Sequence, residues 1–317
     1  MDPSNLEPVL AKDSRLLVAA FYAFTPLDDK RRETLLSSLP TLARDGSVFG
    51  SVLVAHEGVN GTISGPESAV DAVLDHLRAS LVLGNDHYAR LEVKRSWAKK
   101  PVFRRFKARR KKEIVTIGVN SVDPRTSVGT YVEANDWNAL VDDPETLVID
   151  TRNSYETAIG TFEGAIDPST ESFRDFPQWA ESTLRPLIEQ KGSKRIAMFC
   201  TGGIRCEKAS SYLQQQGFGE VHHLRGGILK YLEQVPETES RWRGECFVFD
   251  QRVALNHQLE PGEHSLCYAC GLPVSAQQRE LPSYIKGVQC VHCVDRFTDA
   301  DRERFAMRQH QIDQQQA

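Results

Sequence analysis

The sequence places a cysteine, two glycines and an arginine where an apolar segment meets a helix-forming one. Residues 194–199 read as a buried strand that ends at Cys200, and residues 207–216 favour a helix. Between them lies a short loop made of Thr201, Gly202, Gly203, Ile204 and Arg205. Such a loop turns its N–H groups inward at the positive end of the helix dipole, which stabilises an anion. The pattern therefore predicts a Cys200 thiolate that is nucleophilic at neutral pH.

The other residues of this loop support the same interpretation. The two glycines allow backbone conformations that side chains would block, and Arg205 can place a fixed positive charge over the site. The alternative is a cysteine that merely packs at the end of a core strand. The spacing of cysteine, glycines and arginine favours the reactive cysteine, whereas Cys206 is expected to pack in the first helical turn. Asp150 and Arg152, at the end of the buried strand 146–150, are expected to brace the loop from a neighbouring strand end. The alternative is a buried ion pair with a structural role, which is also compatible with supporting the site.

A second group of cysteines lies near the end of the chain. Two C-x2-C pairs are separated by nineteen residues, and they comprise Cys267, Cys270, Cys290 and Cys293. Paired knuckles at this distance are typical of a tetrahedral zinc site. Two redox dithiols are the alternative, and a structural zinc is favoured. Such a module could also contact RNA.

The charge of the chain is concentrated in one segment. The net charge is −4, but residues 94–112 contain eleven Lys or Arg and no Asp or Glu, so the remainder carries −15. Aromatic residues Trp97, Phe103 and Phe106 lie between these cations and could stack on unpaired bases. A solvated charge run is the alternative. We favour RNA binding, with nine candidate contacts: Lys99, Lys100, Arg104, Arg105, Lys107, Arg109, Arg110, Lys111 and Lys112.

Length and patterning predict several domains. A chain of 317 residues is long enough for two or three. Residues 14–96 alternate as strand, helix, strand, strand, helix, strand, with 89–94 as the closing strand; this order predicts a ferredoxin-like α+β domain. The segment 97–124 is expected to be a basic linker. Residues 125–240 predict an α/β domain with a mainly parallel sheet, from strands near 146–150, 162–166, 194–199 and 221–224 and a helix over 176–189.

The ends of the chain carry further expectations. Residues 241–308 form the expected cysteine-rich C-terminal region, and the glutamine-rich tail 309–317 is expected to be disordered. The first residues lack the basic and apolar regions of a signal peptide, and the apolar run 16–24 is too short to span a bilayer. These features predict a cytoplasmic protein that does not bind membranes. Seven cysteines in such a compartment indicate chemistry and metal rather than disulfides.

Several of these motifs together resemble the rhodanese domain. They are the Asp150–Arg152 strand end, the Gly164–Ile166 segment, Cys200 followed by Arg205, and the run 224–227. In that family the loop cysteine carries a persulfide that the loop amides surround. The six-residue loop matches the sulfur-carrying rhodaneses, whereas related phosphatases have a longer loop, so a phosphatase is disfavoured.

The resemblance extends over most of residues 14–255, to the bacterial rhodanese-type tRNA uridine hydroxylases. The N-terminal domain, the basic segment, the run 200–210 and the run 244–250 carry it. It implies hydroxylation of the wobble uridine to 5-hydroxyuridine with molecular oxygen as co-substrate, an unidentified electron donor, the tRNA anticodon stem-loop as partner, and Cys200 acting through a persulfide. A protein that donates persulfide sulfur is a candidate partner. Two alternatives stay open: a sulfurtransferase acting on tRNA or a protein acceptor, and a non-catalytic RNA-binding module.

Overall fold

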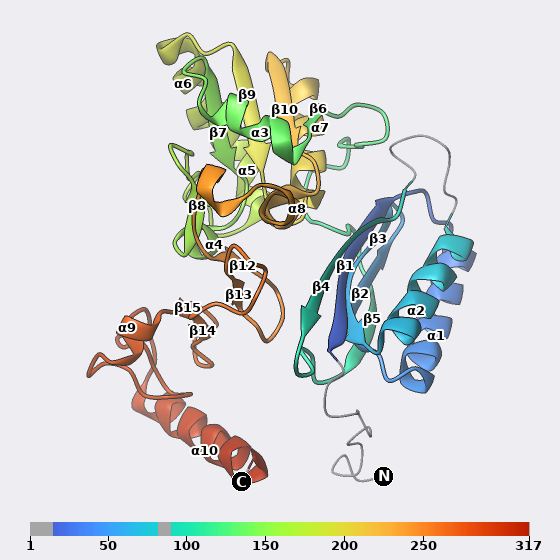
Figure 1. The fold of residues 1–317 in the computed structure, drawn as a ribbon, viewed down its shortest axis with the longest axis vertical. Coiled ribbons are helices and arrows are strands. Elements are labelled where there is room, and N and C mark those ends of the chain that lie inside the picture. The colour runs from blue at the N-terminus through green and yellow to red at the C-terminus, as the bar shows by residue number, and fades with distance from the viewer. Residues whose placement is uncertain (1–14, 82–89, 317) are drawn as a thin grey trace.

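The computed structural model describes residues 15–81 and 90–316, which form three successive parts (Figure 1). An N-terminal domain with one sheet is followed by a central domain built on a parallel sheet and by a smaller C-terminal region. This is the α/β multidomain architecture that the sequence predicts. The first residues of the chain, and Ala89 at the expected start of the closing strand, lie outside the described residues.

The N-terminal domain has the predicted order of strands and helices. Its elements are β1 (Leu16–Phe24), α1 (Asp29–Asp45), β2 (Phe49–Ala55), β3 (Gly58–Gly65), α2 (Glu67–Ser80) and β4 (Glu92–Ala98). The sheet order is β4-β1-β3-β2-β5, and Figure 1 shows α1 and α2 covering one face of it. The Asp28 side chain caps α1 by accepting from the Arg31 N–H.

The expected linker is in large part folded, which corrects the prediction for residues 97–124. Residues Phe106–Arg110 form β5, which pairs in parallel with β2 at the sheet edge. Farther along, Ile114 and Ile117 are buried. The dense charge of this segment conceals a period of two in β5, where Phe106 and Ala108 pack on the core beneath the helices. A charged edge strand is also a common protection against edge-to-edge association.

Strand β1 shows that the face of this sheet opposite the helices is also covered. Its nine residues are almost all buried, whereas a strand with one solvated face alternates. Phe21 packs toward the helices, and Tyr22 packs on the opposite face in a cluster that includes Ile204 of the central domain. The sheet face opposite the helices therefore packs against the loop that follows Cys200.

The central domain is a four-stranded parallel sheet of order β6-β10-β9-β7 with helices around it. The strands are β6 (Thr130–Val132), β7 (Thr146–Asp150), β9 (Arg195–Phe199) and β10 (Glu220–Leu224). The helices are α3 (Ala134–Val141), α4 (Ser154–Thr157), α5 (Phe176–Trp179), α6 (Arg185–Lys191), α7 (Ile204–Gln215) and α8 (Gly227–Gln234), with a π-helical turn over Ala180–Leu184.

One strand of this domain differs from the prediction. Residues 162–166 do not form a strand of the parallel sheet. Instead β8 (Gly160–Phe162) pairs antiparallel with β11 (Trp242–Gly244), and Ile166 forms a single bridge to Ile149. The apolar character of the segment comes from Phe162, which packs among aromatic rings rather than in a sheet ladder.

The C-terminal region consists of small hairpins and one long helix. Its elements are β12 (Cys246–Phe247), β13 (Ala254–Leu255), β14 (Ser265–Leu266), β15 (Pro273–Val274), α9 (Ala276–Arg279) and α10 (Asp299–Gln316). Helix α10 includes most of the tail that was expected to be disordered, so that prediction is wrong for residues 309–316. Its glutamines are good helix formers. None of the helices described here is both long and apolar enough to cross a bilayer.

Candidate active site and cysteine cluster

Cys200 lies at the carboxyl end of β9, where the chain turns into α7. The cysteine is buried, and its Sγ accepts a hydrogen bond of 3.1 Å from the Gly203 N–H. Gly203 has φ of +98°, in the left-handed region that favours glycine, and it is the residue before the first turn of α7. The loop thus directs N–H groups toward the sulfur at a helix N-terminus, as the sequence predicts.

A second turn holds the Cys200 loop from behind. The N–H groups of Ile228 and Leu229 donate to the carbonyls of Cys200 and Thr201 at 2.9 and 3.1 Å. Gly227 lies so close to the loop that an added Cβ would meet the Cys200 carbonyl and would lie 2.8 Å from the Gly202 nitrogen. Because N–H groups of α8 donate hydrogen bonds to the loop carbonyls, the carbonyls point away from the cysteine and the loop N–H groups remain directed at it.

The surroundings favour the thiolate form of Cys200. Burial acts to raise the thiol pKa, but hydrogen bonding from Cys206, the Arg205 charge and nearby backbone N–H groups outweigh it, and the pKa falls to about 5. Burial and the adjacent Cys200 raise the pKa of Cys206, so this second thiol stays protonated. Cys206 is buried at the start of α7, in the packing position expected for it.

Arg205 is fixed by a carboxylate that sequence reasoning missed. Glu156 of α4 accepts from both terminal nitrogens of Arg205 at 2.7 Å, and its side chain is fully buried. Burial acts to raise the Glu156 pKa, but the charge and hydrogen bonds of Arg205 lower it below its usual value. The capping box between Asn153 and Glu156 is a local signal that could have identified this turn. Arg205 is thereby placed beside Cys200 rather than in solvent.

Asp150 and Arg152 form the buried ion pair that was the alternative interpretation of these residues. Their bidentate contacts measure 2.8 and 2.6 Å, and both side chains are inaccessible to solvent. Arg152 also donates to the Gly160 carbonyl and lies 5.1 Å from the centre of the Trp242 ring. The pair does not touch Cys200. It joins the end of β7 to β8 and lies near Glu156, the carboxylate that holds Arg205. The Asp150 charge also acts on Arg205, since it adds to the Glu156 charge that raises the Arg205 pKa against the effect of burial.

The cysteine opens into a cleft between the N-terminal and central domains. The cleft encloses about 420 Å³ and is lined on one side by the sheet face of β1, β2 and β3 and on the other by the Cys200 loop. Two buried contacts fix the domains around it: the Tyr22 hydroxyl donates to Glu207 at 2.9 Å, and Lys208 pairs with Glu57 at 2.8 Å. The volume falls within the ~300–1,000 Å³ of small-ligand sites.

Lys94 of β4 is a further cleft residue that was not among the predicted contacts. Its Nζ is buried, finds no hydrogen-bond acceptor among the residues that the structure describes, and lies 4.5 Å from the centre of the Tyr22 ring. Burial lowers its pKa, while the Glu92, Cys200 and Glu207 charges oppose that shift. The cation is therefore available to a ligand in the cleft. Period-two alternation along β4 could have placed it on this face.

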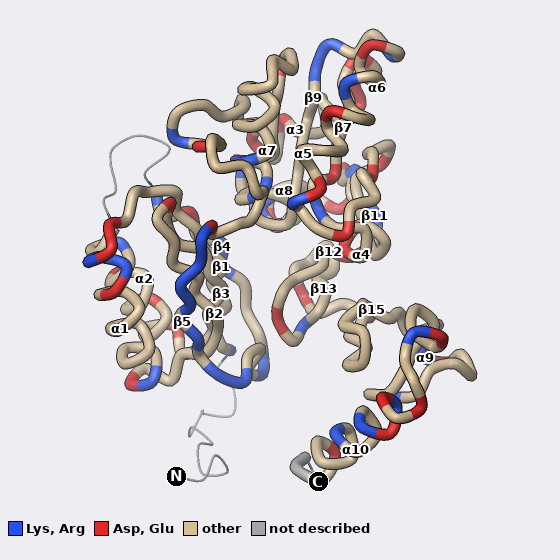
Figure 2. Tube along the Cα trace, turned by 180° about the vertical axis from the view of Figure 1, so that it is seen from behind, with Lys and Arg blue, Asp and Glu red and all other residues tan. Residues whose placement is uncertain are grey.

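The nine predicted RNA contacts lie in β5 and in the loops on either side of it, a segment that is largely blue in Figure 2. Within β5, successive side chains lie on opposite faces of the sheet. In the parallel register, Lys107 and Arg109 pair with Ser51 and Leu53, which line the cleft. Arg110 points to the opposite face and pairs with Glu33 of α1. The other six residues, in the loops on either side of β5, are exposed: Lys99, Lys100, Arg104, Arg105, Lys111 and Lys112.

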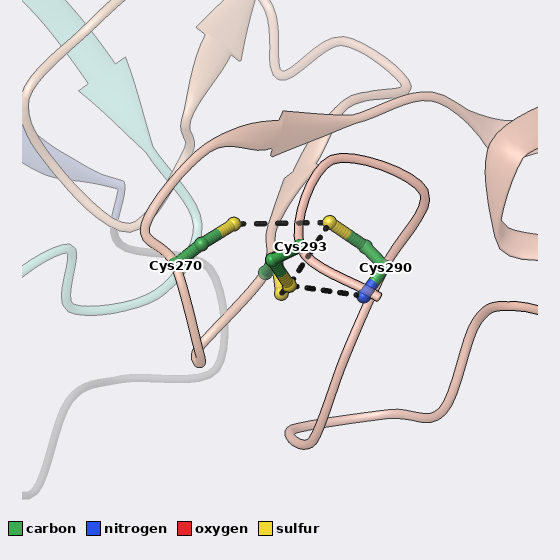
Figure 3. A group of neighbouring side chains, drawn as sticks. Cys270, Cys290 and Cys293 are labelled. Atoms are coloured by element: carbon green, nitrogen blue, oxygen red, sulfur yellow. Dashed lines mark hydrogen bonds between the residues drawn. The ribbon is translucent and has the colours of Figure 1, made fainter. Parts of the chain in front are cut away.

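The four C-terminal cysteines converge as their spacing predicts, and Figure 3 labels three of them: Cys270, Cys290 and Cys293. Their sulfur atoms all lie within 4.8 Å of one another, with separations of 3.8 Å for Cys267–Cys293 and 3.7 Å for Cys270–Cys290. A tetrahedron with Zn–S bonds of ~2.3 Å has edges of about 3.8 Å. The Cys290 N–H also donates to the Cys293 sulfur at 3.3 Å. The geometry fits a metal ion bound by four thiolates.

The fold and the loop define the class of protein. Residues 133–234 match the rhodanese-like domain family, and residues 16–114 match the UPF0176 acylphosphatase like domain family. The family comparisons therefore find the same two domains, in the same order along the chain, as the structure does.

Relatives of known name cover the whole chain. The tRNA uridine(34) hydroxylase of Synechococcus sp. (strain CC9605) is 92% identical over 316 residues, which span 100% of this chain and 97% of that protein. The tRNA uridine(34) hydroxylase of Prochlorococcus marinus (strain MIT 9313) is 56% identical over 98% of both chains. This chain belongs to the tRNA uridine(34) hydroxylase family.

Proposed function

We propose that this protein hydroxylates uridine 34 of tRNA to 5-hydroxyuridine, with molecular oxygen as co-substrate and Cys200 as the reactive group. The observation that carries the proposal is the cleft that places Cys200 opposite a basic sheet face. Relatives of this chain over nearly its full length bear the name of that activity. One oxygen atom is inserted at the C5–H bond to give the C5 hydroxyl group, and the other is reduced to water with two electrons and two protons from a donor.

The cleft has the features needed to hold a flipped-out pyrimidine. Uracil is flat and carries two carbonyl oxygens, and the cleft offers apolar walls together with a buried ammonium. Lys94 would donate to a carbonyl oxygen of the base and so orient its ring relative to Cys200. Lys107 and Arg109, on the same sheet face, would contact the phosphates beside it. Unpaired loop nucleotides are the RNA elements most readily extruded in this way.

The persulfide form of Cys200 is part of the proposal. The loop N–H groups and Arg205 favour an anion at this position, and an outer persulfide sulfur is an anion as well. In the step from thiol to persulfide, the Cys200 thiolate would attack the outer sulfur of a persulfide on a donor protein. The new S–S bond forms as the donor S–S bond breaks, and the donor is released as its thiol. The cleft that Cys200 and Gly202 line offers space for that atom.

The C-terminal cysteines are proposed to bind one structural zinc ion. Four thiolates at tetrahedral spacing complete the coordination of zinc and leave no open position for catalysis. The cluster lies within its own small core with Val274, apart from the Cys200 cleft. Zinc would hold together a region whose hairpins are only two residues long on each strand.

The deciding experiment is nucleoside mass spectrometry of tRNA from cells that lack this protein, complemented with the wild type or with Cys200→Ser. The proposal expects 5-hydroxyuridine-derived nucleosides to disappear and to return only with the wild type. A missing thiolated nucleoside would instead indicate a sulfurtransferase. Full complementation by Cys200→Ser would eliminate both enzymes and leave an RNA-binding module.

A further inference from the structure

A second cleft adjoins the active-site cleft. It encloses about 570 Å³ between the segment 102–104, the turn 247–253 and the cysteine-rich module, which contributes Tyr268 and Gly271. Phe103 and Phe249 line both clefts. The two clefts therefore form one path that leads from Cys200 toward the C-terminal module.

Two of the walls of the second cleft are hydrogen-bonded to each other. The Gln251 N–H donates to the Val102 carbonyl at 3.0 Å, and Arg252 donates to the Ser96 hydroxyl at 2.8 Å. Both bonds join the turn 247–253 to the N-terminal domain. The cleft is consequently a feature of the folded protein rather than a chance gap between parts.

Two aromatic rings stand exposed along this path. Phe249 is 61% exposed and Tyr268 is 52% exposed, although aromatic side chains usually cover their faces in the core. Phe249 is supported by a T-shaped contact with Phe247, with ring centres 5.2 Å apart, and by the Arg205 guanidinium 6.0 Å from its ring centre. Its exposed surface remains open to a ligand. Flat exposed rings beside a groove are typical of base-stacking platforms in single-stranded nucleic-acid sites.

The charge along the rim suits a phosphate backbone. Arg104 lines the cleft, and Lys99, Lys100 and Arg105 are exposed in the same loop between β4 and β5, seen in blue in Figure 2. The acidic lining residue, Asp250, is neutralised by Arg252 through two hydrogen bonds. A groove with cations at its rim and aromatic rings in its walls fits RNA better than an acidic or apolar peptide.

We propose that the second cleft binds the unpaired nucleotides next to the target base, with Phe249 and Tyr268 as stacking platforms and Arg104 as a phosphate contact. The cysteine-rich module then serves as one wall of an RNA site, in addition to any structural role of its metal. The identity of the target base rests on the proposed function, but the site for its neighbours rests on this cleft alone.

The test measures the affinity of the full-length protein for an anticodon stem-loop RNA at several salt concentrations. Tyr268→Ala is expected to weaken binding by about tenfold, since one base loses its stacking partner. Arg104→Ala is expected to weaken binding. The slope of log affinity against log salt concentration should also become smaller by about one, as expected for the loss of one phosphate contact. The controls are Met307→Ala, an exposed residue of α10 that lines neither cleft, and Arg243→Ala, an exposed arginine outside both.

Photo-cross-linking of the same RNA to the wild-type protein gives a readout that needs no variant. Cross-links to peptides that contain Phe249 or Tyr268 would support the proposal, and cross-links confined to other surfaces would overturn it. Hydroxylation of the RNA by the wild type is followed in parallel. If the wild type hydroxylates the RNA and Tyr268→Ala binds as the wild type does, the cleft proposal fails. If the wild type forms no 5-hydroxyuridine but Tyr268→Ala still loses affinity, the proposed function fails and the cleft proposal stands.

Discussion

Glu156 holds Arg205 through two parallel hydrogen bonds of 2.7 Å, and this pair is buried beside Cys200. The carboxylate comes from α4 and the guanidinium from the first turn of α7, so the contact joins two segments of the central domain. A planar, bidentate contact fixes the direction of the guanidinium as well as its position. The cation that favours the Cys200 thiolate is thus held in place by its own counter-ion.

Glu156→Gln is expected to lower the free energy of unfolding by about 3 kcal/mol, since it leaves a buried guanidinium without a charged partner. Urea unfolding of both proteins at pH 7 measures the difference. The matched control is Glu181→Gln, which removes an exposed partner of Arg185 and is expected to cost less than about 1 kcal/mol. Equal losses for the two variants would contradict the structural importance of the buried pair.

The stability contributed by Glu156 depends on pH in a defined direction. Arg205 outweighs burial and lowers the folded-state pKa of this carboxyl. Its contribution is therefore complete above the unfolded pKa of about 4.3 and is lost as pH falls through the lower folded value. The gap in stability between wild type and Glu156→Gln should narrow in that acid range. A gap that stays constant down to pH 2 would show that the charge is not responsible.

Alkylation of Cys200 by iodoacetamide is expected to stay fast well below the usual thiol range. With a pKa of about 5, the thiolate predominates at pH 6, and the rate should be half-maximal near pH 5. Cys246 is an internal control, because burial raises its pKa to about 12 and it is inaccessible. Mass spectrometry of the labelled peptides separates the two sites. A half-maximal rate near pH 8.5 at Cys200 would contradict the thiolate assignment.

The sequence was sufficient for the features that depend on local order. The C-x4-R loop and the C-x2-C pairs each follow from spacing within a short segment. The βαββαβ order follows from the succession of apolar patterns along the N-terminal domain. Glu156 and Lys94 were missed because their roles arise from contacts that cross the fold. Lys94 lies opposite Cys200 only after two domains pack together, and Glu156 meets Arg205 across a separation of 49 residues.

The basic segment shows a different limit of sequence reasoning. Its charge density indicates RNA binding but hides the alternation that makes β5 a strand. Strand alternation then assigns neighbouring cations to opposite faces, which composition alone does not do. The helical structure of the tail was not predicted, because its glutamine-rich composition suggested disorder. Glutamine is also a good helix former, and these residues continue the helix that begins at Asp299.

Substitution of Gly227 by alanine is expected to impair both folding and activity. The new Cβ would meet the Cys200 carbonyl and lie 2.7 Å from the Gly203 nitrogen, so the cysteine loop would have to move. Gly192→Ala is the matched control, since Gly192 has a similar φ of +63° but no atom within 4 Å of an added Cβ. Both variants carry the left-handed strain of about 1 kcal/mol, and only Gly227→Ala should also lose Cys200 alkylation. Similar alkylation in the two variants would contradict the packing argument.

The two faces of β5 allow a direct test of RNA binding. Lys107→Ala and Arg109→Ala remove cations from the cleft face, and each is expected to weaken tRNA binding several-fold with a smaller salt slope. Arg110→Ala removes a cation from the helix face, where it pairs with Glu33, and should leave affinity within about twofold. Filter binding at several salt concentrations measures all three. An effect of Arg110→Ala equal to the others would show that only total charge matters.

Removal of metal should destabilise the C-terminal region and leave the reactive cysteine intact. Purified protein is expected to contain about one zinc per chain, because four thiolates converge at tetrahedral spacing. A strong chelator should then increase hydrogen exchange around β14, β15 and α9, while alkylation of Cys200 keeps its rate and pH profile. Cys290→Ser is expected to reproduce the chelator effect, and Cys206→Ser, which removes a thiol outside the cluster, should retain the metal. Protein that lacks metal yet shows unchanged exchange after chelation would contradict the zinc proposal.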